Sequence, residues 1–164
     1  MRLTAVQGDI TVQDVDAVVN AANRAMRGGG GVDGAIHRAG GPEVLADCKR
    51  RFPHGLATGQ AGWTTAGAMA AQWVIHVVGP NWNRGQKERS LLTACYVNAL
   101  HVADEIGARS LAFPLVSAGA YGWPFDDAVA AMVDTLRRTP TQVQEARLVA
   151  FGRRAYDAIS AAVG

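Results

Sequence analysis

Cysteine is scarce in this sequence, and long apolar runs are absent. The 164 residues include only Cys48 and Cys95, too few for a disulfide framework, so we expect reduced thiols packed against apolar helix faces. No apolar stretch approaches the roughly 20 residues that a membrane-spanning helix needs. The segment from Arg2 to Thr11 is too short and too mixed in polarity for a signal peptide. We therefore expect a cytoplasmic protein without a membrane partner.

An excess of charge of either sign is also missing. Sixteen Lys and Arg residues balance 14 Asp and Glu residues, which leaves a net charge of +2 and no basic run or basic–aromatic stripe. A nucleic-acid-binding surface is typically strongly basic, so we expect no nucleic-acid partner. The hydrophobic content of 49% is typical of globular chains. We expect residues 1–164 to form a single domain and, without a heptad seam, a monomer.

The four histidines are scattered, which argues against a metal site. His76 lies in an apolar strand pattern, His37 and His101 lie on helical patterns, and His54 lies in a loop. No Cys/His pair has the spacing of a metal-binding motif. We therefore interpret all four as structural histidines and expect no metal and no cofactor.

Short apolar runs alternate with helical patterns along the chain, which predicts an α/β fold. The predicted strands are Leu3–Gln7, Ala17–Ala21, Gly62–Thr65, Trp73–Val78, Ser110–Phe113 and Ala146–Phe151. The predicted helices are Val32–Ala39, Glu43–Phe52, Glu88–Ile106, Phe125–Arg138 and Arg154–Val163. Some strands are apolar on both faces, so we expect a three-layer α/β/α sandwich, in which ligands bind beyond the carboxyl ends of the strands.

Two glycine-rich loops follow predicted strands and run directly into helices. The first contains Asn20-Ala21-Ala22-Asn23 and then Gly28–Gly34, and the second is Ser117–Pro124. Glycine allows the backbone to approach a ligand closely, and the N–H groups at a helix start favour an anion. The two loops could therefore hold a diphosphate from both sides without any lysine.

Two common phosphate motifs do not fit the first loop. A P-loop ends in Gly-Lys-Ser/Thr, whereas Val32 follows Gly31 here. Residues Gly29–Gly34 match the dinucleotide-binding pattern as a string, but they begin well after the strand ends. Asp47 stands at about the required distance of 20 residues, yet it lies on a helical pattern rather than after a second strand.

Together these segments resemble the macro domain family, specifically its MacroD-type hydrolase branch. They occur in the family's order and span nearly the whole chain. The matching segments are Gly8–Thr11, Val18–Asn23, Gly28–Gly41 (GGGGVDGAIHRAGG), Thr58-Gly59-x-Ala61, Val74–Pro80, Ala112–Pro114 and Ser117–Pro124. The resemblance implies a central mixed, mostly parallel sheet, and ADP-ribose or ADP-ribosylated proteins as partners.

The resemblance also implies roles for individual residues. Asp9, beside Ile10, would accept a hydrogen bond from the adenine amino group, although a turn or cap role is the alternative. Phe151 would stack on adenine, with a plain core position as the alternative. The complete set implied for ADP-ribose binding is Asp9, Ile10, Asn23, Gly30, Gly31, Val32, Asp33, Ser117, Ala118, Gly119, Ala120, Tyr121 and Phe151.

By the same resemblance, Asn23, Asp33 and Tyr121 form the catalytic group at the distal ribose. Asn23 would position the ribose, Asp33 would lie by the scissile ester, and Tyr121 would pack on the sugar and orient a water. The structural alternatives are that Asn23 is only a turn residue and that Asp33 is only an acid at a helix N-terminus. Whether Asp33 acts as a general base or as a positioning group stays open.

The implied function is hydrolysis of mono-ADP-ribose esters on Asp or Glu side chains, together with O-acetyl-ADP-ribose deacetylation. A water held by the diphosphate and Asp33 would attack the ester or the anomeric carbon without a metal. One alternative is a non-catalytic module that reads ADP-ribose. Another is a module for a different nucleotide end, such as ADP-ribose phosphate or an RNA terminus.

The sequence departs from the family pattern at a few positions near the site. Ala118 stands where Thr is usual, Ala57 replaces a frequent Cys, and Gly62-Trp63 lacks a common Lys. We expect Trp63 and the segment Trp82-Asn83-Arg84 mainly to pack. None of these changes removes a residue of the implied catalytic group.

Overall fold

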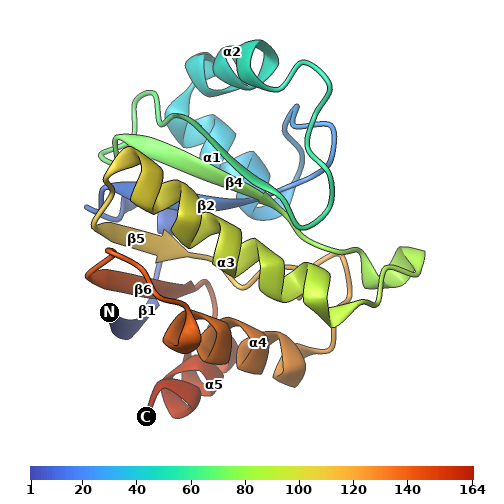
Figure 1. The fold of residues 1–164 in the computed structure, drawn as a ribbon, viewed down its shortest axis with the longest axis vertical. Helices are drawn as coiled ribbons and strands as arrows, with labels where there is room; N and C mark the ends of the chain where they lie inside the picture. The colour runs from blue at the N-terminus through green and yellow to red at the C-terminus, as the bar shows by residue number, and fades with distance from the viewer.

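The computed structural model describes residues 1–164 and is built around a six-stranded sheet (Figure 1). The strands are β1 (Arg2–Gln7), β2 (Ala17–Ala22), β3 (Ala61–Thr65), β4 (Trp73–Val78), β5 (Ser110–Phe113) and β6 (Glu145–Ala150). The helices are α1 (Gly31–Gly40), α2 (Pro42–Arg51), α3 (Arg89–Ile106), α4 (Phe125–Arg138) and α5 (Arg153–Val163). Two short 3₁₀ turns, η1 (Ile10–Val12) and η2 (Trp82–Arg84), follow β1 and β4.

The strand order is β1-β6-β5-β2-β4-β3. Every neighbouring pair is parallel except β3 and β4, which are antiparallel, so β3 is an antiparallel edge strand. The expected mixed, mostly parallel sheet is therefore confirmed. Because five strands run in the same direction, their carboxyl ends lie along one edge of the sheet, where ligand-binding loops gather in such folds.

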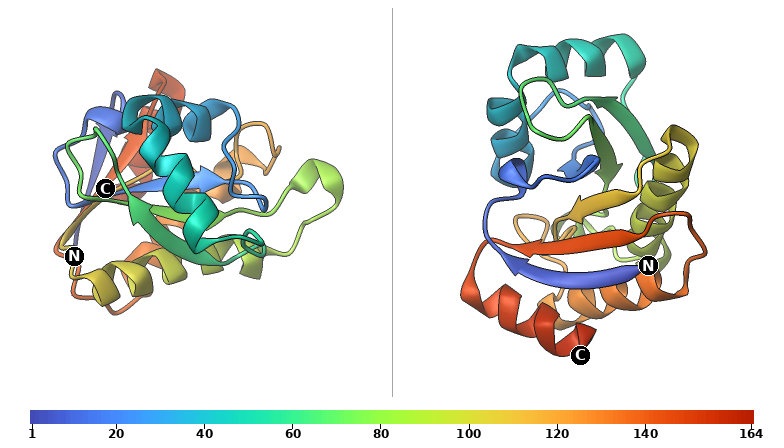
Figure 2. Two further views of the ribbon diagram at one scale, coloured as in Figure 1. Left: turned by 90° about the horizontal axis from the view of Figure 1, so that it is seen from above. Right: turned by 90° about the vertical axis from the view of Figure 1, so that its left-hand side faces the viewer.

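Helices cover both faces of the sheet, which confirms the three-layer sandwich. Alternate side chains point to opposite faces: Ile75 and Val77 of β4 join the larger core against α3, α4 and α5, whereas Val74 joins a smaller core with Ile36 of α1. Figure 2 (right) shows α1 and α3 on opposite sides of the strands. The larger core contains 27 buried residues, the smaller contains 9, and a third cluster of 5 includes Val44 and Cys48 of α2, so most of the apolar burial lies on the α3 side.

The predicted element boundaries agree closely with the structure. The bounds of β4, β5 and α4 coincide with the predicted ranges, and the other elements differ by about one residue at an end. Gly107 ends α3 in the left-handed region, with φ of 77°. The two 3₁₀ turns were not predicted, because three residues are too short to show a period.

The strands β2 and β5 separate early, and this separation opens the sheet at its carboxyl edge. They pair only through Ala17 with Leu111 and Val18 with Ala112. Beyond these residues β2 continues beside β4 as far as Ala22. The helix after β2 covers one face and the helix after β5 covers the other, so the two connecting loops leave in opposite directions. Such a change of direction is where open α/β sheets bind ligands.

A buried tyrosine of α3 supports the chain as it leaves β5. The hydroxyl oxygen of Tyr96 accepts a hydrogen bond of 3.0 Å from the backbone N–H of Val116, directly before Ser117. Tyr96 is fully buried, and burial raises the pKa of its hydroxyl above the ordinary value of 10.0.

We expect Tyr96→Phe to lower the free energy of unfolding by about 1–3 kcal/mol, because the buried Val116 N–H loses its acceptor. Urea denaturation of the purified protein measures this change. Tyr156→Phe is the matched control, since no hydrogen bond holds the hydroxyl of the partly buried Tyr156, and it should change stability by under about 0.5 kcal/mol. Equal effects of the two substitutions would contradict the role of the Tyr96 hydroxyl.

Candidate functional site

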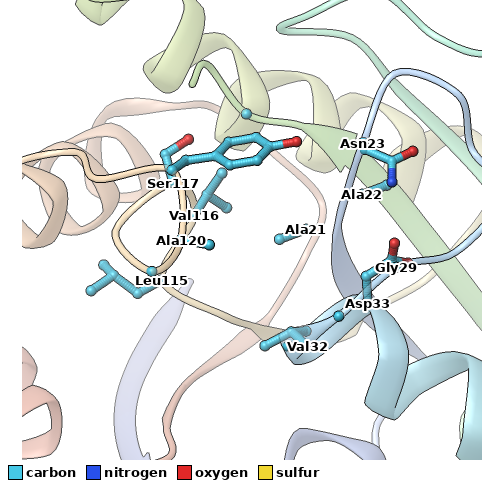
Figure 3. Close-up of a pocket in the computed structure, with 15 residues that line it drawn as sticks. Ala21, Ala22, Asn23, Gly29, Val32, Asp33, Leu115, Val116, Ser117 and Ala120 are labelled. Atoms are coloured by element: carbon cyan, nitrogen blue, oxygen red, sulfur yellow. The ribbon is translucent and has the colours of Figure 1, made fainter. Parts of the chain in front are cut away.

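A cavity of about 310 Å³ lies between the loops that follow β2 and β5. In Figure 3, Gly29, Val32 and Asp33 lie on one side, Leu115, Ser117 and Ala120 lie on the other, and Ala21 lies between them. The lining residues are Ala21, Ala22, Asn23, Gly29, Gly30, Gly31, Val32, Asp33, Gly79, Leu115, Val116, Ser117, Gly119, Ala120 and Tyr121. The two glycine-rich loops predicted to face one site therefore do line a single cavity.

Most of the residues singled out from the sequence lie in this lining, and four do not. Asp9, Ile10 and Phe151 lie outside it, and Ala118 packs against the larger core. The lining residues missed from the sequence are Ala21, Ala22, Gly29, Gly79, Leu115 and Val116. Ala21, Ala22 and Gly29 belong to the first predicted loop but were given no role, Leu115 and Val116 directly precede the second loop, and Gly79 follows a buried strand. Their positions beside the predicted loops and strand were the available signal.

The first loop delivers the N-terminus of α1 to the cavity. Gly30 is the N-cap residue and no side chain caps this end, so the first N–H groups of the helix are available to an anion. Gly34 lies so close to the loop that an added Cβ would lie 2.6 Å from the carbonyl oxygen of Gly29. A side chain at this position would push the loop away from the helix.

The second loop contains a strained serine. Ser117 adopts a φ of 67°, a left-handed conformation that costs a non-glycine residue about 1–3 kcal/mol. Its Oγ is buried and has no hydrogen-bond partner within the protein. Gly79 faces it, and a Cβ on Gly79 would overlap this oxygen. The loop thus places an unused hydroxyl donor in the cavity wall, where a ligand oxygen can accept from it.

Asn23 shapes the first loop from within. Its Nδ2 donates to the carbonyl oxygen of Gly28 at 3.0 Å, and its Oδ1 accepts from the backbone N–H of Met26 at 3.2 Å. The turn role considered as an alternative is therefore present. The same side chain also lines the cavity, and one N–H of its amide has no partner in the structure.

Asp33 is held from behind by buried polar groups. It lies in the first turn of α1 with only 5% of its surface exposed. Its Oδ1 accepts from Asn20 Nδ2 at 2.8 Å and lies 3.3 Å from His37 Nε2. Its Oδ2 has no hydrogen-bond partner, and it lies 3.2 Å from where a Cβ on Gly29 would be. The second oxygen is therefore the one directed toward the cavity wall.

The chain of contacts behind Asp33 continues into the sheet. Asn20 Nδ2 lies 3.1 Å from His76 Nδ1, and His76 Nε2 lies 2.8 Å from Thr64 Oγ1. The Thr64 hydroxyl donates to the carbonyl oxygen of Thr65 at 3.0 Å, so it accepts from His76 Nε2–H. His76 Nδ1 must then be the acceptor for Asn20. This arrangement turns the NH₂ of Asn20, rather than its oxygen, toward Asp33.

The expectation of a structural His76 is confirmed, but its link to Asp33 was missed. His76 is 1% exposed, and burial lowers its pKa from 6.5 to about 3, with the nearby His37 adding to this effect. The imidazole therefore stays neutral at physiological pH and can act as the acceptor. The sequence did not predict that Asn20 and Thr64 support Asp33, because their contacts join residues more than ten positions apart.

Asp9 and Phe151 lie together at the ends of β1 and β6. These strands are paired, and the backbone N–H of Gly8 donates to the carbonyl oxygen of Ala150 at 2.9 Å. Asp9 Oδ1 accepts from the hydroxyl (2.7 Å) and the backbone N–H (2.8 Å) of Thr11, and these bonds lower the pKa of Asp9. Asp9 is thus the cap of η1, as the alternative for it suggested.

Phe151 is 94% exposed, so the alternative of a plain core phenylalanine is wrong. It follows β6 in a bend rather than ending the strand as expected. Ile10 is buried instead, within the smaller core that also contains Val149. An exposed ring beside an acidic cap is an arrangement suited to a flat ligand with a hydrogen-bond donor at its edge.

The remaining expectations concern cysteine, tryptophan and metal. Cys48 and Cys95 are buried, and burial raises their pKa values to about 11 and 12. Trp63 packs under the guanidinium of Arg51, 3.7 Å from the ring centre, and Trp82 packs edge-on against Trp123. No three His, Cys, Asp or Glu side chains converge as metal ligands. None of the helices has the length and apolar character required to span a bilayer.

Because the pKa of His76 falls on folding, we expect stability to depend on pH. Between pH 6.5 and about 3 the unfolded chain carries a proton on His76 that the folded protein lacks. Lowering the pH through this window therefore reduces the free energy of unfolding, by up to about 1.4 kcal/mol per pH unit. Urea denaturation at a series of pH values from 7.5 to 5 measures the slope.

The control for this slope is His76→Asn, which keeps an acceptor for Asn20 but cannot titrate. The variant should lose this part of the pH dependence, while the other histidines contribute equally to both proteins. An unchanged slope, or His76 ring resonances that titrate above pH 5 in NMR spectra, would contradict the neutral imidazole.

Comparison with known proteins identifies the family. The family model of the macro domain matches residues 19–132. A macro domain-containing protein of Streptomyces coelicolor is 54% identical over 166 residues, covering 99% of this chain and 98% of the relative. The O-acetyl-ADP-ribose deacetylase 1 of Pantoea vagans is 41% identical over 162 residues, covering 95% of each chain.

The same fold occurs in a solved structure. The Trypanosoma brucei macrodomain in complex with ADP-ribose superposes with a TM-score of 0.89 at 33% identity, covering 99% of this chain and 69% of the other. The extent of the family match, the high identity over whole chains and the shared fold agree with one another. This chain belongs to the macro domain family.

Proposed function

We propose that this protein binds ADP-ribose and hydrolyses mono-ADP-ribose esters from Asp and Glu side chains. The observation that carries the proposal is the single cavity that combines two backbone-lined loops with Asn23, Asp33 and Tyr121. The loops suit a diphosphate, and the three side chains suit a sugar and a water beside it. The names of the Pantoea vagans and Trypanosoma brucei proteins support ADP-ribose as the ligand.

The proposed ligand extends along the carboxyl edge of the sheet. Adenine lies against Phe151, with its amino group donating to the free oxygen of Asp9. The diphosphate lies between the N-terminus of α1 and the loop of Ser117, where backbone N–H groups meet its charge. The distal ribose then reaches Asn23, Asp33 and Tyr121. Binding energy gained at the first two parts positions the third for reaction.

The proposed reaction is hydrolysis by a positioned water. The water oxygen forms a bond to the ester carbonyl carbon or to the anomeric carbon, and the bond from that carbon to the ester oxygen breaks. In both cases the products are free ADP-ribose and the side-chain carboxylic acid. Asp33 Oδ2 holds the water, while Asn20 and His37 fix Oδ1. The same step on an acetyl ester gives acetate, so we include O-acetyl-ADP-ribose as a substrate.

We further propose that residues 1–164 act as one cytoplasmic domain and as a monomer. A single sheet organises the cores on both of its faces. Among the large hydrophobic residues, only Met1, Val12 and Phe151 are exposed. Three exposed apolar residues are too few for the large continuous patch that an obligate interface requires.

We expect Asp33→Asn to lower the rate of ADP-ribose release about 100-fold or more, because positioned acid–base groups contribute about 10²–10⁴-fold to rate. The assay follows free ADP-ribose from a protein mono-ADP-ribosylated on glutamate. Asp134→Asn is the matched control, because Asp134 is an exposed acid on α4 without a hydrogen-bond partner, and it should release ADP-ribose at the wild-type rate.

Calorimetry with ADP-ribose accompanies this assay to separate binding from chemistry. Binding by both proteins with release by the wild type alone supports the enzyme. Tight binding without release from glutamate, serine or acetyl esters would leave a reader of ADP-ribose and overturn the hydrolase. An active Asp33→Asn variant would remove Asp33 from the reaction.

We expect Phe151→Ala to weaken ADP-ribose binding about tenfold, since stacking of a base on an aromatic ring contributes roughly 1–3 kcal/mol. The exposed ring packs on nothing in the protein, so the melting temperature should stay within about 1 °C of wild type. Phe151→Tyr keeps a stacking surface and should bind as the wild type does. Equal affinity of all three proteins would place adenine elsewhere.

A further inference from the structure

A second cavity, of about 330 Å³, adjoins the first. The two share Asn23, Gly79 and Tyr121, so each of these residues lines both. The other residues lining the second cavity, called the recess below, are Arg24, Ala25, Thr58, Val78, Asn81, Arg84 and Gln86. Neither the sequence patterns nor the proposed ADP-ribose position assigns anything to this space.

The location of the recess determines what can reach it. Two of the shared residues, Asn23 and Tyr121, contact the distal ribose in the proposed function, on which this inference rests. A group bonded to that ribose leaves the first cavity at this point. The modified side chain and the peptide that carries it therefore enter the recess.

The recess is cationic. Arg24 and Arg84 are the only charged residues in its lining, and no carboxylate lines it. Both arginines are exposed, and neither guanidinium group forms a salt bridge or a hydrogen bond within the protein. Elsewhere the arginines of several surface pairs, such as Arg89 with Asp127, are already engaged with a carboxylate. An unpaired guanidinium at a recess is free to bind a carboxylate through paired N–H groups.

The walls of the recess are fixed before any ligand arrives. Gln86 Oε1 accepts from the backbone N–H of Asn81 at 2.8 Å, and Gln86 Nε2 donates to Thr58 Oγ1 at 3.4 Å. Asn83, next to Arg84, connects η2 to the second loop. Its backbone N–H donates to the carbonyl oxygen of Tyr121 at 3.1 Å, and its Nδ2 donates to that of Ala120 at 3.0 Å. A preformed site loses less entropy on binding.

The charge that these arginines meet must come from neighbours of the modified residue. Esterification removes the charge of the modified Asp or Glu itself, so that side chain offers no anion to the recess. Carboxylates at adjacent positions of the same peptide keep their charge. We propose that the recess binds an acidic peptide segment flanking the modified residue, and that Arg24 and Arg84 thereby select targets modified within acidic sequences.

The test compares binding of three ligands that cannot be hydrolysed. They are free ADP-ribose and two peptides in which an amide replaces the ester between glutamate and the distal ribose. One peptide has glutamate at the flanking positions and the other has glutamine. The proteins are the wild type, the double variant Arg24→Gln/Arg84→Gln, and Arg138→Gln as a control at an exposed arginine of α4 that has no partner.

We expect the wild type and Arg138→Gln to bind the glutamate-flanked peptide about three- to tenfold more tightly than the glutamine-flanked one, as for a few exposed ion pairs. The preference should shrink at high salt. The double variant should lose the preference and keep its affinity for free ADP-ribose. This pattern supports the inference.

Other patterns overturn it in distinguishable ways. Equal affinity of the wild type for the two peptides, or a preference that survives in the double variant, overturns the role of the recess while ADP-ribose binding stands. Loss of the preference in Arg138→Gln attributes it to overall charge and overturns the recess as well. Failure to bind even free ADP-ribose overturns the proposed function, and with it the inference.

Discussion

The early separation of β2 and β5 is the constraint on which the site depends. After two residue pairs, the ladder hydrogen bonds of β2 continue to β4 and those of β5 to β6. Both connecting loops line one cavity at the diverging ends of these strands. Because α1 and α4 then cover opposite faces of the sheet, neither loop covers the opening. The cavity is thus lined by two loops, each held between the end of a strand and the start of a helix.

Within this opening, buried polar groups hold Asp33 in place. Burying Asn20, His76 and Thr64 costs desolvation, which their mutual hydrogen bonds offset, although Asn20 Oδ1 remains without a partner. Burial lowers the pKa of His76 and so keeps its imidazole neutral. Only a neutral ring has a nitrogen that can accept a hydrogen bond, and this fixes which group of each pair in the network donates. A neutral ring with its proton on Nε2 accepts from Asn20, and Asn20 must then donate to Asp33. The network fixes one oxygen of Asp33 and leaves the other for the cavity.

The two cavities share their boundary residues because several segments meet there at very short range. Gly79, at the end of β4, has no room for a side chain beside the strained Ser117. The 3₁₀ turn η2 is tied to the second loop through Asn83 and through the contact of Trp82 with Trp123. The cavity proposed for ADP-ribose and the recess proposed for the target peptide therefore share Asn23, Gly79 and Tyr121 as lining residues. A change in η2 would therefore reach both.

The sequence by itself determined the strands, the helices and the two glycine-rich loops, because hydrophobic period and glycine clusters are local signals. It also pointed to Asn23, Asp33 and Tyr121, which belong to these two loops and line the cavity. Only the tertiary structure decided that Phe151 is exposed, that Ala118 faces the core, and that Ser117 is strained with an unused hydroxyl. The contacts of Asn20 with His76 and of Asn83 with Ala120 span 56 and 37 positions. No local pattern encodes such contacts, since they exist only once the sheet brings distant strand ends together.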